Sequence, residues 1–321
     1  RGKKFIDKYK YEYELIDVPN LFSKKYLLPI NIFKYIYNIT KSINFIKTNR
    51  IDIIISTGGY MTIPFCIAAF ILKKKIFLFE PNSVLGRSNK FVLKFSQKII
   101  CYDKDLKNFP NKYNSKMVVI KPILKKQIFS IKKNSLNLND KISKLLIIGG
   151  SQGASFFDTK ITKLIIEISK KYNLEINQQI SSGNVAHHLK NEYEKEKINY
   201  KFFEFTENAD EIYDGVNLAI TRGGAGILSE LSYLKIPFIS IPLPSARDNH
   251  QFFNSVFYHK KNCCWLIDQN KFVFDDIKTL LFDIFSNHKD YIEKSENLEK
   301  LTQKNTWNNT NNHIIEIINE N

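Results

Sequence analysis

The chain has 321 residues, which is enough for two domains that each bury a hydrophobic core. Its 43% hydrophobic and 25% charged residues are typical of a globular protein and exclude a disordered chain. The formal net charge of +16 suits polyanionic partners, but Lys, Asn and Ile are abundant along the entire length, so a solvated basic surface without a partner is an equal alternative.

The first predicted element is an amphipathic helix from Ile32 onward. Isoleucines follow the helical spacing and predict one core-facing stripe, made of Ile32, Ile36, Ile39, Ile43 and Ile46. Aromatic and basic residues fall on the opposite side, namely Phe33, Lys34, Tyr37 and Lys41. This outward face suits an anionic bilayer surface, and a merely solvated Lys-rich face is the alternative.

Short β-branched runs then alternate with longer helical patterns. The runs predicted as strands are 51–56, 76–80, 99–102, 118–120, 145–148, 174–178, 200–205, 218–221, 238–241 and 264–267. Alternation of this kind predicts an α/β protein with βαβ units and parallel sheets. A Lys- and Asn-rich stretch at 121–144 separates two groups of strands, so we expect domains at 1–124 and 125–321, with the last helix packing back on the first domain.

The cysteines and the apolar runs bear on metal binding and on membrane spanning. The four cysteines show no metal-ligand spacing and are interpreted as buried residues in a reducing compartment. The longest charge-free apolar run, Met61–Leu72, is too short to span a bilayer. The chain begins at Arg1 without a signal pattern, and we expect its N-terminus to be incomplete.

Glycine-rich or polar loops follow several predicted strands, at the edge where parallel α/β sheets bind ligands. They are 56–60, 80–89, 149–155 and 221–231. Each loop has an ordinary structural interpretation by itself, as a turn, a helix cap or a site of close helix packing. Their joint occurrence at strand ends favours a binding site.

The segment 221–251 has the order of parts that a nucleotide-sugar site requires. Gly223 and Gly224 leave room for a diphosphate at the N-terminus of the next helix. Glu230 is a candidate partner for vicinal ribose hydroxyls. Asp248, His250 and Gln251 offer donors and acceptors for sugar hydroxyls.

These motifs together resemble those of the MurG glycosyltransferases, which transfer N-acetylglucosamine from UDP-N-acetylglucosamine (UDP-GlcNAc) to undecaprenyl-pyrophosphoryl-N-acetylmuramoyl-pentapeptide (lipid I), giving lipid II for peptidoglycan. Segment 58–60 resembles the family's G-G-Y loop, and 80–89 its H-E-Q-N-x-x-x-G-x-x-N segment. Segment 149–154 reproduces G-G-S-Q-G-A, 221–231 resembles S-R-A-G-A-x-T-x-S-E-L, and 248–251 resembles D-x-H-Q. The likeness runs from Arg1 to about Gln269.

The resemblance implies a GT-B fold, in which two Rossmann-like domains with parallel sheets face one cleft. It implies that the C-terminal domain binds the donor, with Ser151 at the diphosphate, the Phe205–Thr206 backbone at the uracil, Glu230 at the ribose, and His250 and Gln251 at the GlcNAc hydroxyls. The full set of expected donor-binding residues is Asn82, Gly149, Gly150, Ser151, Gln152, Gly153, Thr206, Arg222, Gly223, Gly224, Ala225, Glu230, His250 and Gln251. Expected on the acceptor side are Gly58, Gly59 and Tyr60, together with Glu80 and Asn82.

The implied chemistry is an inverting displacement that needs a base and positive charge near the departing UDP. The family's favoured base is a histidine in a G-G-T-G-G-H loop that this sequence does not contain, so Glu80 is the catalytic candidate here. The family's diphosphate arginine is replaced by Leu124, and Lys121, Lys125 or Arg222 are the substitutes. We expect no metal and no cofactor.

The resemblance also implies a peripheral enzyme on the cytoplasmic face of the bacterial inner membrane, with UDP-GlcNAc, lipid I and an anionic membrane surface as partners. We expect no nucleic acid, because the sequence has no basic motif with interleaved aromatic residues. The alternatives are another GT-B enzyme, such as a glycolipid transferase or a UDP-GlcNAc epimerase, and a nucleotide-sugar-binding protein without catalysis.

Overall fold

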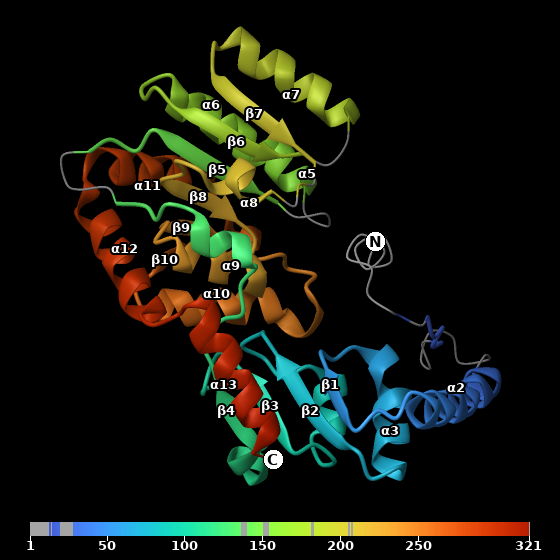
Figure 1. Cartoon of the computed structure of the whole chain (residues 1–321). Coiled ribbons are helices and arrows are strands. Elements are labelled where there is room, and N and C mark those ends of the chain that lie inside the picture. Colours follow the sequence, from blue (N-terminus) through green and yellow to red (C-terminus); the bar gives the residue numbers. More distant parts are fainter. Residues whose placement is uncertain are drawn as a thin grey trace.

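The computed structural model describes residues 13, 15–19, 28–135, 140–149, 154–180, 183–204, 206 and 208–320. Within this part of the chain, ten strands form two parallel sheets, each flanked by helices (Figure 1). Every predicted strand is confirmed to within two residues at each end, because short β-branched runs between helical patterns are the signal of buried parallel strands. The predicted α/β class with two parallel sheets is confirmed.

The first sheet has the order β1-β2-β3-β4. Its strands are β1 (Ile53–Ser56), β2 (Lys75–Glu80), β3 (Lys98–Cys101) and β4 (Met117–Val119). Ile76 and Leu78 of β2 point to a core shared with α2 (Leu28–Thr48), α3 (Ile63–Ile71) and α4 (Arg87–Val92). Phe77, between them, points to the opposite face, as strand geometry requires.

The second sheet has the order β10-β9-β8-β5-β6-β7. Its strands are β5 (Lys144–Ile148), β6 (Glu175–Gln179), β7 (Asn199–Phe203), β8 (Leu218–Thr221), β9 (Phe238–Ser240) and β10 (Cys264–Leu266). The chain winds outward in both directions from β5, so the strand order reverses between β5 and β8. In open α/β sheets this reversal creates a crevice at the carboxyl ends of the two strands.

Helices cover both faces of the second sheet. Leu145 and Ile147 pack with α6 (Thr162–Ser169) and α11 (Phe274–Ser286), whereas Leu146 packs with α9 (Ala225–Tyr233) and α10 (His250–Lys260). The remaining helices are α5 (Ala154–Phe156), α7 (Gly183–Lys195), α8 (Ala209–Tyr213), α12 (His288–Thr302) and α13 (Trp307–Asn319), with one π-helical turn at Phe157–Ile161. Short 3-10 helices lie at Tyr60–Thr62, Asn111–Lys116, Lys126–Ser130, Arg247–Asn249 and Gln269–Lys271.

The C-terminal helix α13 returns to the first sheet (Figure 1), where Ile317 packs with Phe77 and Ile100. Two hydrogen bonds hold this crossing: Lys121 Nζ donates to the Leu301 carbonyl at 2.9 Å, and Asn305 Nδ2 donates to the Pro122 carbonyl at 3.2 Å. In the other direction, Ile120 packs with the first sheet and Leu124 with the core of the second. The chain therefore passes between the two cores within 121–123.

Helix α2 is present where predicted, but the predicted isoleucine stripe is wrong in its first half. Ile32 and Ile36 are exposed, and the buried face there carries Asn31 and Asn38. Asn38 is buried because its Nδ2 donates to the Asp17 carbonyl at 2.9 Å. The buried face follows the expected isoleucines only in the second half, where Ile46 lies in the core.

None of the helices in the described ranges has the length and apolar character needed to cross a bilayer. All four cysteines are buried and unbridged, in agreement with their interpretation as small core residues. Burial raises the pKa of each thiol, for example that of Cys101 to about 12.

Candidate functional site

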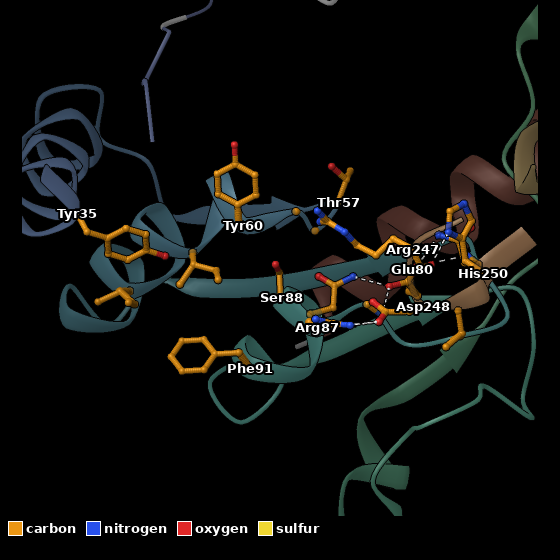
Figure 2. Close-up of a pocket in the computed structure, with 18 residues that line it drawn as sticks. Tyr35, Thr57, Tyr60, Glu80, Arg87, Ser88, Phe91, Arg247, Asp248 and His250 are labelled. Atoms are coloured by element: carbon orange, nitrogen blue, oxygen red, sulfur yellow. Dashed lines mark hydrogen bonds and ion pairs between the residues drawn. The ribbon is translucent and has the colours of Figure 1, made fainter. Parts of the chain in front are cut away.

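A cavity of about 740 Å³ opens beside the carboxyl ends of β1 and β2, where the loops of the first sheet meet residues Arg247–His250 of the second domain (Figure 2). It collects all five residues expected on the acceptor side, of which Asn82 is also expected on the donor side, together with the donor candidate His250. Those in its lining are Gly58, Gly59, Tyr60, Glu80, Asn82 and His250. Thr206 and Glu230 do not line this cavity.

Glu80 organises the loop that follows β2. Its side chain is 4% exposed, and its carboxylate accepts four hydrogen bonds. The donors are Asn82 N at 3.3 Å, Asn82 Nδ2 at 2.9 Å, Gly86 N at 2.9 Å and Asn89 Nδ2 at 3.0 Å. A general base needs a free lone pair directed at the substrate hydroxyl. Because all four hydrogen bonds engage the carboxylate, this geometry favours a positioning role for Glu80, and its expected catalytic role stays a prediction.

The expected glycine loop after β1 packs on this arrangement. Gly58 and Gly59 have φ values of 82° and 86°, which side-chain-bearing residues rarely adopt. A Cβ at Gly58 would lie 3.1 Å from Asn89 Nδ2, whereas a Cβ at Gly59 would meet no atom within 4 Å. Gly58 is therefore favoured by its backbone conformation and by its tight packing on Asn89, and open space beside Gly59 is available to a ligand.

Asn254 of α10 joins the loops of the two domains. Its side chain is 2% exposed; Nδ2 donates to Asn82 Oδ1 at 3.1 Å and to the Gly223 carbonyl at 3.0 Å, and Oδ1 accepts from Ser83 N at 2.7 Å. Sequence reasoning missed this residue. The only available signal was its position one helical turn after His250, on the same face of α10.

A second contact between the domains is the ion pair of Arg87 and Asp248 (Figure 2). Asp248 Oδ1 accepts from Arg87 Nη2 at 2.6 Å and from Nε at 2.9 Å. Asp248 and Asn249 both have left-handed backbone conformations, with φ of 51° and 56°, which Asp and Asn tolerate better than most residues. Asp248, expected to accept from a sugar, is occupied by this arginine.

The glycines before α9 have different roles. A Cβ at Gly223 would lie 2.1 Å from the Gln251 carbonyl oxygen, so Gly223 permits α10 to pack closely. A Cβ at Gly224 would meet only the Ile227 side chain, at 3.5 Å. Gly224 caps α9 and Ala225 begins it, so this helix N-terminus lies beside the reversal point between β5 and β8, as a diphosphate site requires.

The other expected phosphate loop follows β5 at the same reversal point. Gly149 is buried directly after the strand. Gly150, Ser151, Gln152 and Gly153 lie outside the described residues, as does Phe205.

Arg222 does not have the geometry expected of a phosphate ligand. It is 5% exposed; its Nη1 donates to the Ile241 carbonyl at 2.9 Å and to Gln269 Oε1. The guanidinium lies 4.7 Å from the Phe157 ring centroid. Desolvation lowers the pKa of Arg222 to about 10. The side chain is turned into the core of the second domain, so the geometry does not favour a diphosphate contact and the expected role of Arg222 stays a prediction.

Glu230 lies one helical turn and a half into α9, half-buried, and accepts a hydrogen bond from the Tyr213 hydroxyl of α8. Burial raises the pKa of Glu230, while Tyr213 and the charge of Lys125 oppose the rise. Of the three cations that could replace the family arginine, Lys125 has a charge that acts on Glu230. Lys121 instead donates to the Leu301 carbonyl, and Arg222 is buried.

Three further donor candidates are already hydrogen-bonded within the protein. Thr206 Oγ1 donates to Glu211 Oε2 at 2.9 Å, and Gln251 Oε1 accepts from Leu243 N at 2.9 Å. His250 Nδ1 lies 2.8 Å from the Arg247 carbonyl oxygen, so a neutral imidazole that donates from Nδ1 has Nε2 available as an acceptor.

Comparisons with known proteins agree in family and in fold. The sequence matches the glycosyltransferase family 28 N-terminal domain over residues 1–101 and the family 28 C-terminal domain over residues 144–309. A relative from Pelagibacter ubique (strain HTCC1062), named UDP-N-acetylglucosamine--N-acetylmuramyl-(pentapeptide) pyrophosphoryl-undecaprenol N-acetylglucosamine transferase, is 43% identical over 100% of this chain and 89% of its own length.

Two solved structures show how widely the fold is shared. The structure of Acinetobacter baumannii MurG matches with a TM-score of 0.77 and 19% identity, over 100% of this chain and 88% of that one. A UDP-GlcNAc 2-epimerase from Neisseria meningitidis, bound to UDP-GlcNAc, matches with a TM-score of 0.63 and 14% identity, over 100% and 89%. At these identities both likenesses show the GT-B fold alone, because proteins that share a fold can catalyse different reactions.

Proposed function

The chain belongs to glycosyltransferase family 28 and, within it, to the MurG glycosyltransferases, and from this premise we propose that it transfers N-acetylglucosamine from UDP-GlcNAc to lipid I, giving lipid II. The observation that carries the proposal is the 43% identity, over the whole chain, to a relative named for this transfer. The epimerase likeness is limited to the fold at 14% identity.

On the donor side, we propose that UDP-GlcNAc binds at the reversal point of the second sheet. The α9 N-terminus at Gly224 is suited to the diphosphate, and the half-buried Glu230 carboxylate to the ribose hydroxyls. Lys125 supplies positive charge in place of the family arginine. His250 and Gln251 then lie at the end of the site that faces the first domain, beside Asp248.

The reaction is a direct displacement with inversion. The acceptor hydroxyl attacks the anomeric carbon of GlcNAc on the face opposite UDP, and the bond between that carbon and the diphosphate oxygen breaks as the glycosidic bond forms. UDP departs with the electron pair, and the hydroxyl proton passes to a base. Glu80 holds the acceptor-side loop in shape, and Asn254 fixes that loop against Gly223 of the donor side.

We further propose that the protein docks on the anionic cytoplasmic face of the inner membrane through α2. Phe33 is 74% exposed, and Ile32, Ile36 and Tyr37 are exposed beside it, with Lys34 on the same part of the helix. Apolar and basic side chains together suit a bilayer interface. Because Ile32 and Ile36 are exposed instead of buried, this apolar surface is larger than the sequence predicted.

The membrane proposal is tested by liposome co-sedimentation of the double variant Phe33→Ala/Lys34→Glu. Removing an aromatic ring that would insert into the interface and reversing one basic charge should weaken binding to anionic vesicles by about 2 to 4 kcal/mol. Lys47→Glu, near the far end of the same helix, is the matched control. Equal pelleting of the double variant and the control would place the membrane contact elsewhere.

Transfer itself is tested with radiolabelled UDP-GlcNAc and a lipid I analogue. We expect label in the lipid fraction only when both substrates are present. Conversion of UDP-GlcNAc to another UDP-sugar without acceptor would identify an epimerase. Binding of UDP-GlcNAc with neither transfer nor conversion would identify a binding protein.

A further inference from the structure

The cavity between the domains has two chemically different ends (Figure 2). Arg87, Arg247 and His250 lie at one end, near the second domain, whereas Tyr35 of α2 and Phe91 of α4 lie at the other. Ile63 and Ile67, one turn apart on α3, also line the cavity. A ligand that fills it must therefore be polar at one end and hydrocarbon at the other.

The polar end suits a pyrophosphate. Gly59 leaves open space beside its backbone, and the hydroxyls of Thr57 and Ser88 line the same cavity. Arg247 is exposed there, and Arg87 is held by a single carboxylate oxygen of Asp248. Phosphate oxygens compete well for arginine because they accept two parallel hydrogen bonds from a guanidinium.

The apolar end does not suit a sugar or a peptide backbone, both of which need hydrogen-bond partners when buried. Burial raises the pKa of the Tyr35 hydroxyl to about 12, so this side chain stays uncharged. Ile63 and Ile67 have no polar atoms in their side chains, and Phe91 is half-exposed to the cavity and solvent. Three of the four side chains are pure hydrocarbon and Tyr35 adds an aromatic ring, so hydrocarbon is the ligand chemistry that this end mainly offers to bind.

This end is also continuous with the surface that we propose to face the membrane. Tyr35 lies on α2 between Ile32 and Ile36, which are both exposed. Helix α2 packs against α3, which carries Ile63 and Ile67. A hydrocarbon chain leaving the cavity at Tyr35 therefore meets further apolar side chains before it reaches lipid.

We propose that the apolar end of this cavity, formed by Tyr35, Ile63, Ile67 and Phe91, is a binding site for the isoprenyl units next to the pyrophosphate of the acceptor. The inference rests on the proposed function for the identity of the acceptor. It adds that the enzyme binds the lipid itself, in a protein site, in addition to its head group. Each CH₂ group buried there contributes about a fourfold gain in affinity.

The test is equilibrium binding of farnesyl pyrophosphate and of inorganic pyrophosphate to the full chain, in water without membrane or detergent and below the micelle concentration. We expect farnesyl pyrophosphate to bind at least about tenfold more tightly. Ile67→Asn removes most of that difference and leaves the affinity for inorganic pyrophosphate unchanged. Ile71→Asn is the matched control, since it makes the same change one turn further along α3, outside the cavity.

A second pair of variants covers the case in which Ile67→Asn does not fold. Phe91 and Phe70 both contact the Phe95 ring and are about half-exposed, but only Phe91 lines the cavity. Phe91→Ala should reduce the preference for the farnesyl group several-fold, and Phe70→Ala should not. Equal affinity for the two pyrophosphates, or equal losses within each matched pair, would overturn the proposal.

A transfer assay separates this inference from the proposed function. The acceptors are pyrophosphoryl-N-acetylmuramoyl-pentapeptides that carry either a farnesyl or a methyl group. Transfer to both with the same KM would leave the proposed function intact and overturn the prenyl site. Transfer to neither would contradict the proposed function, whereas the binding comparison would still decide whether the cavity holds a prenyl chain.

Discussion

Glu80 is a buried carboxylate at the end of β2 and Glu230 is a half-buried carboxylate within α9, and their surroundings differ. Glu80 accepts four hydrogen bonds from its own loop and from Asn89, which occupies its oxygens. Glu230 accepts from Tyr213 and remains partly exposed, so it keeps acceptor capacity for a ligand. A carboxylate's environment, more than its presence in a motif, therefore indicates whether it shapes a site or binds a substrate.

The largest expected effect is on stability and comes from Glu80→Ala. The substitution leaves several buried N–H donors without an acceptor, and we expect the free energy of unfolding to fall by about 3 kcal/mol or more. Denaturant titration measures this change. A variant as stable as the parent would show that the four hydrogen bonds do not hold the loop together.

Glu230→Ala should affect binding more than stability. Loss of a charge-assisted hydrogen bond to ribose weakens UDP affinity by about 1 to 3 kcal/mol, measured by calorimetry. Glu230→Gln, which keeps the shape of the side chain, should show a similar loss. Unchanged affinity in both variants would remove Glu230 from the donor site.

Tyr213→Phe sharpens the comparison by removing the protein partner of Glu230. Tyr213 is buried and its hydroxyl donates to the carboxylate, so the variant leaves Glu230 free to rotate. We expect UDP affinity to fall by about 0.5 to 1.5 kcal/mol. Tyr233→Phe, in the same domain, is the control, and an equal loss there would indicate a general effect on packing.

The smallest expected effect is the pH dependence of UDP binding. Burial raises the pKa of Glu230, so its protonation begins at a higher pH than for an exposed glutamate. Affinity should fall as pH falls through this raised pKa, because the protonated carboxyl accepts hydrogen bonds less well. The sign for folding is opposite: the folded state binds the proton more tightly than the unfolded state, so Glu230 contributes stability below its unfolded pKa that is lost as pH rises through its folded pKa.

This pH profile has two internal checks. Glu230→Gln should flatten it. Tyr213→Phe should move its midpoint to higher pH, since the Tyr213 hydrogen bond lowers the pKa of Glu230. A profile that is the same in parent and Glu230→Gln protein would assign the titration to another group.

The sequence predicted the strands well because most are short β-branched or aromatic runs between helical patterns, and this local signal marks a strand before its partners are known. It failed for the first half of α2. An isoleucine-rich helix has apolar residues on more than one face, and the buried face is selected by contacts such as that of Asn38 with Asp17, 21 residues away. Periodicity alone cannot show which apolar face is covered.

The sequence predicted which loops form the site, but it did not predict the direction of each side chain. The glycines and Glu80 belong to motifs, but the motifs do not state direction: Arg222 turns into the core, and Glu80 turns into its own loop. Asn254 and Tyr213 were missed because their partners, Asn82 and Glu230, come from other elements. Such pairs become visible only when the fold brings them together.

The central claim, that Glu230 binds the donor while Glu80 shapes the site, is tested most directly by titrating UDP into Glu230→Gln and Glu80→Gln protein in parallel. We predict that Glu230→Gln lowers the affinity about tenfold or more. Glu80→Gln should bind UDP as the parent does. Equal affinities for the two variants, or a larger loss in Glu80→Gln, would contradict the account.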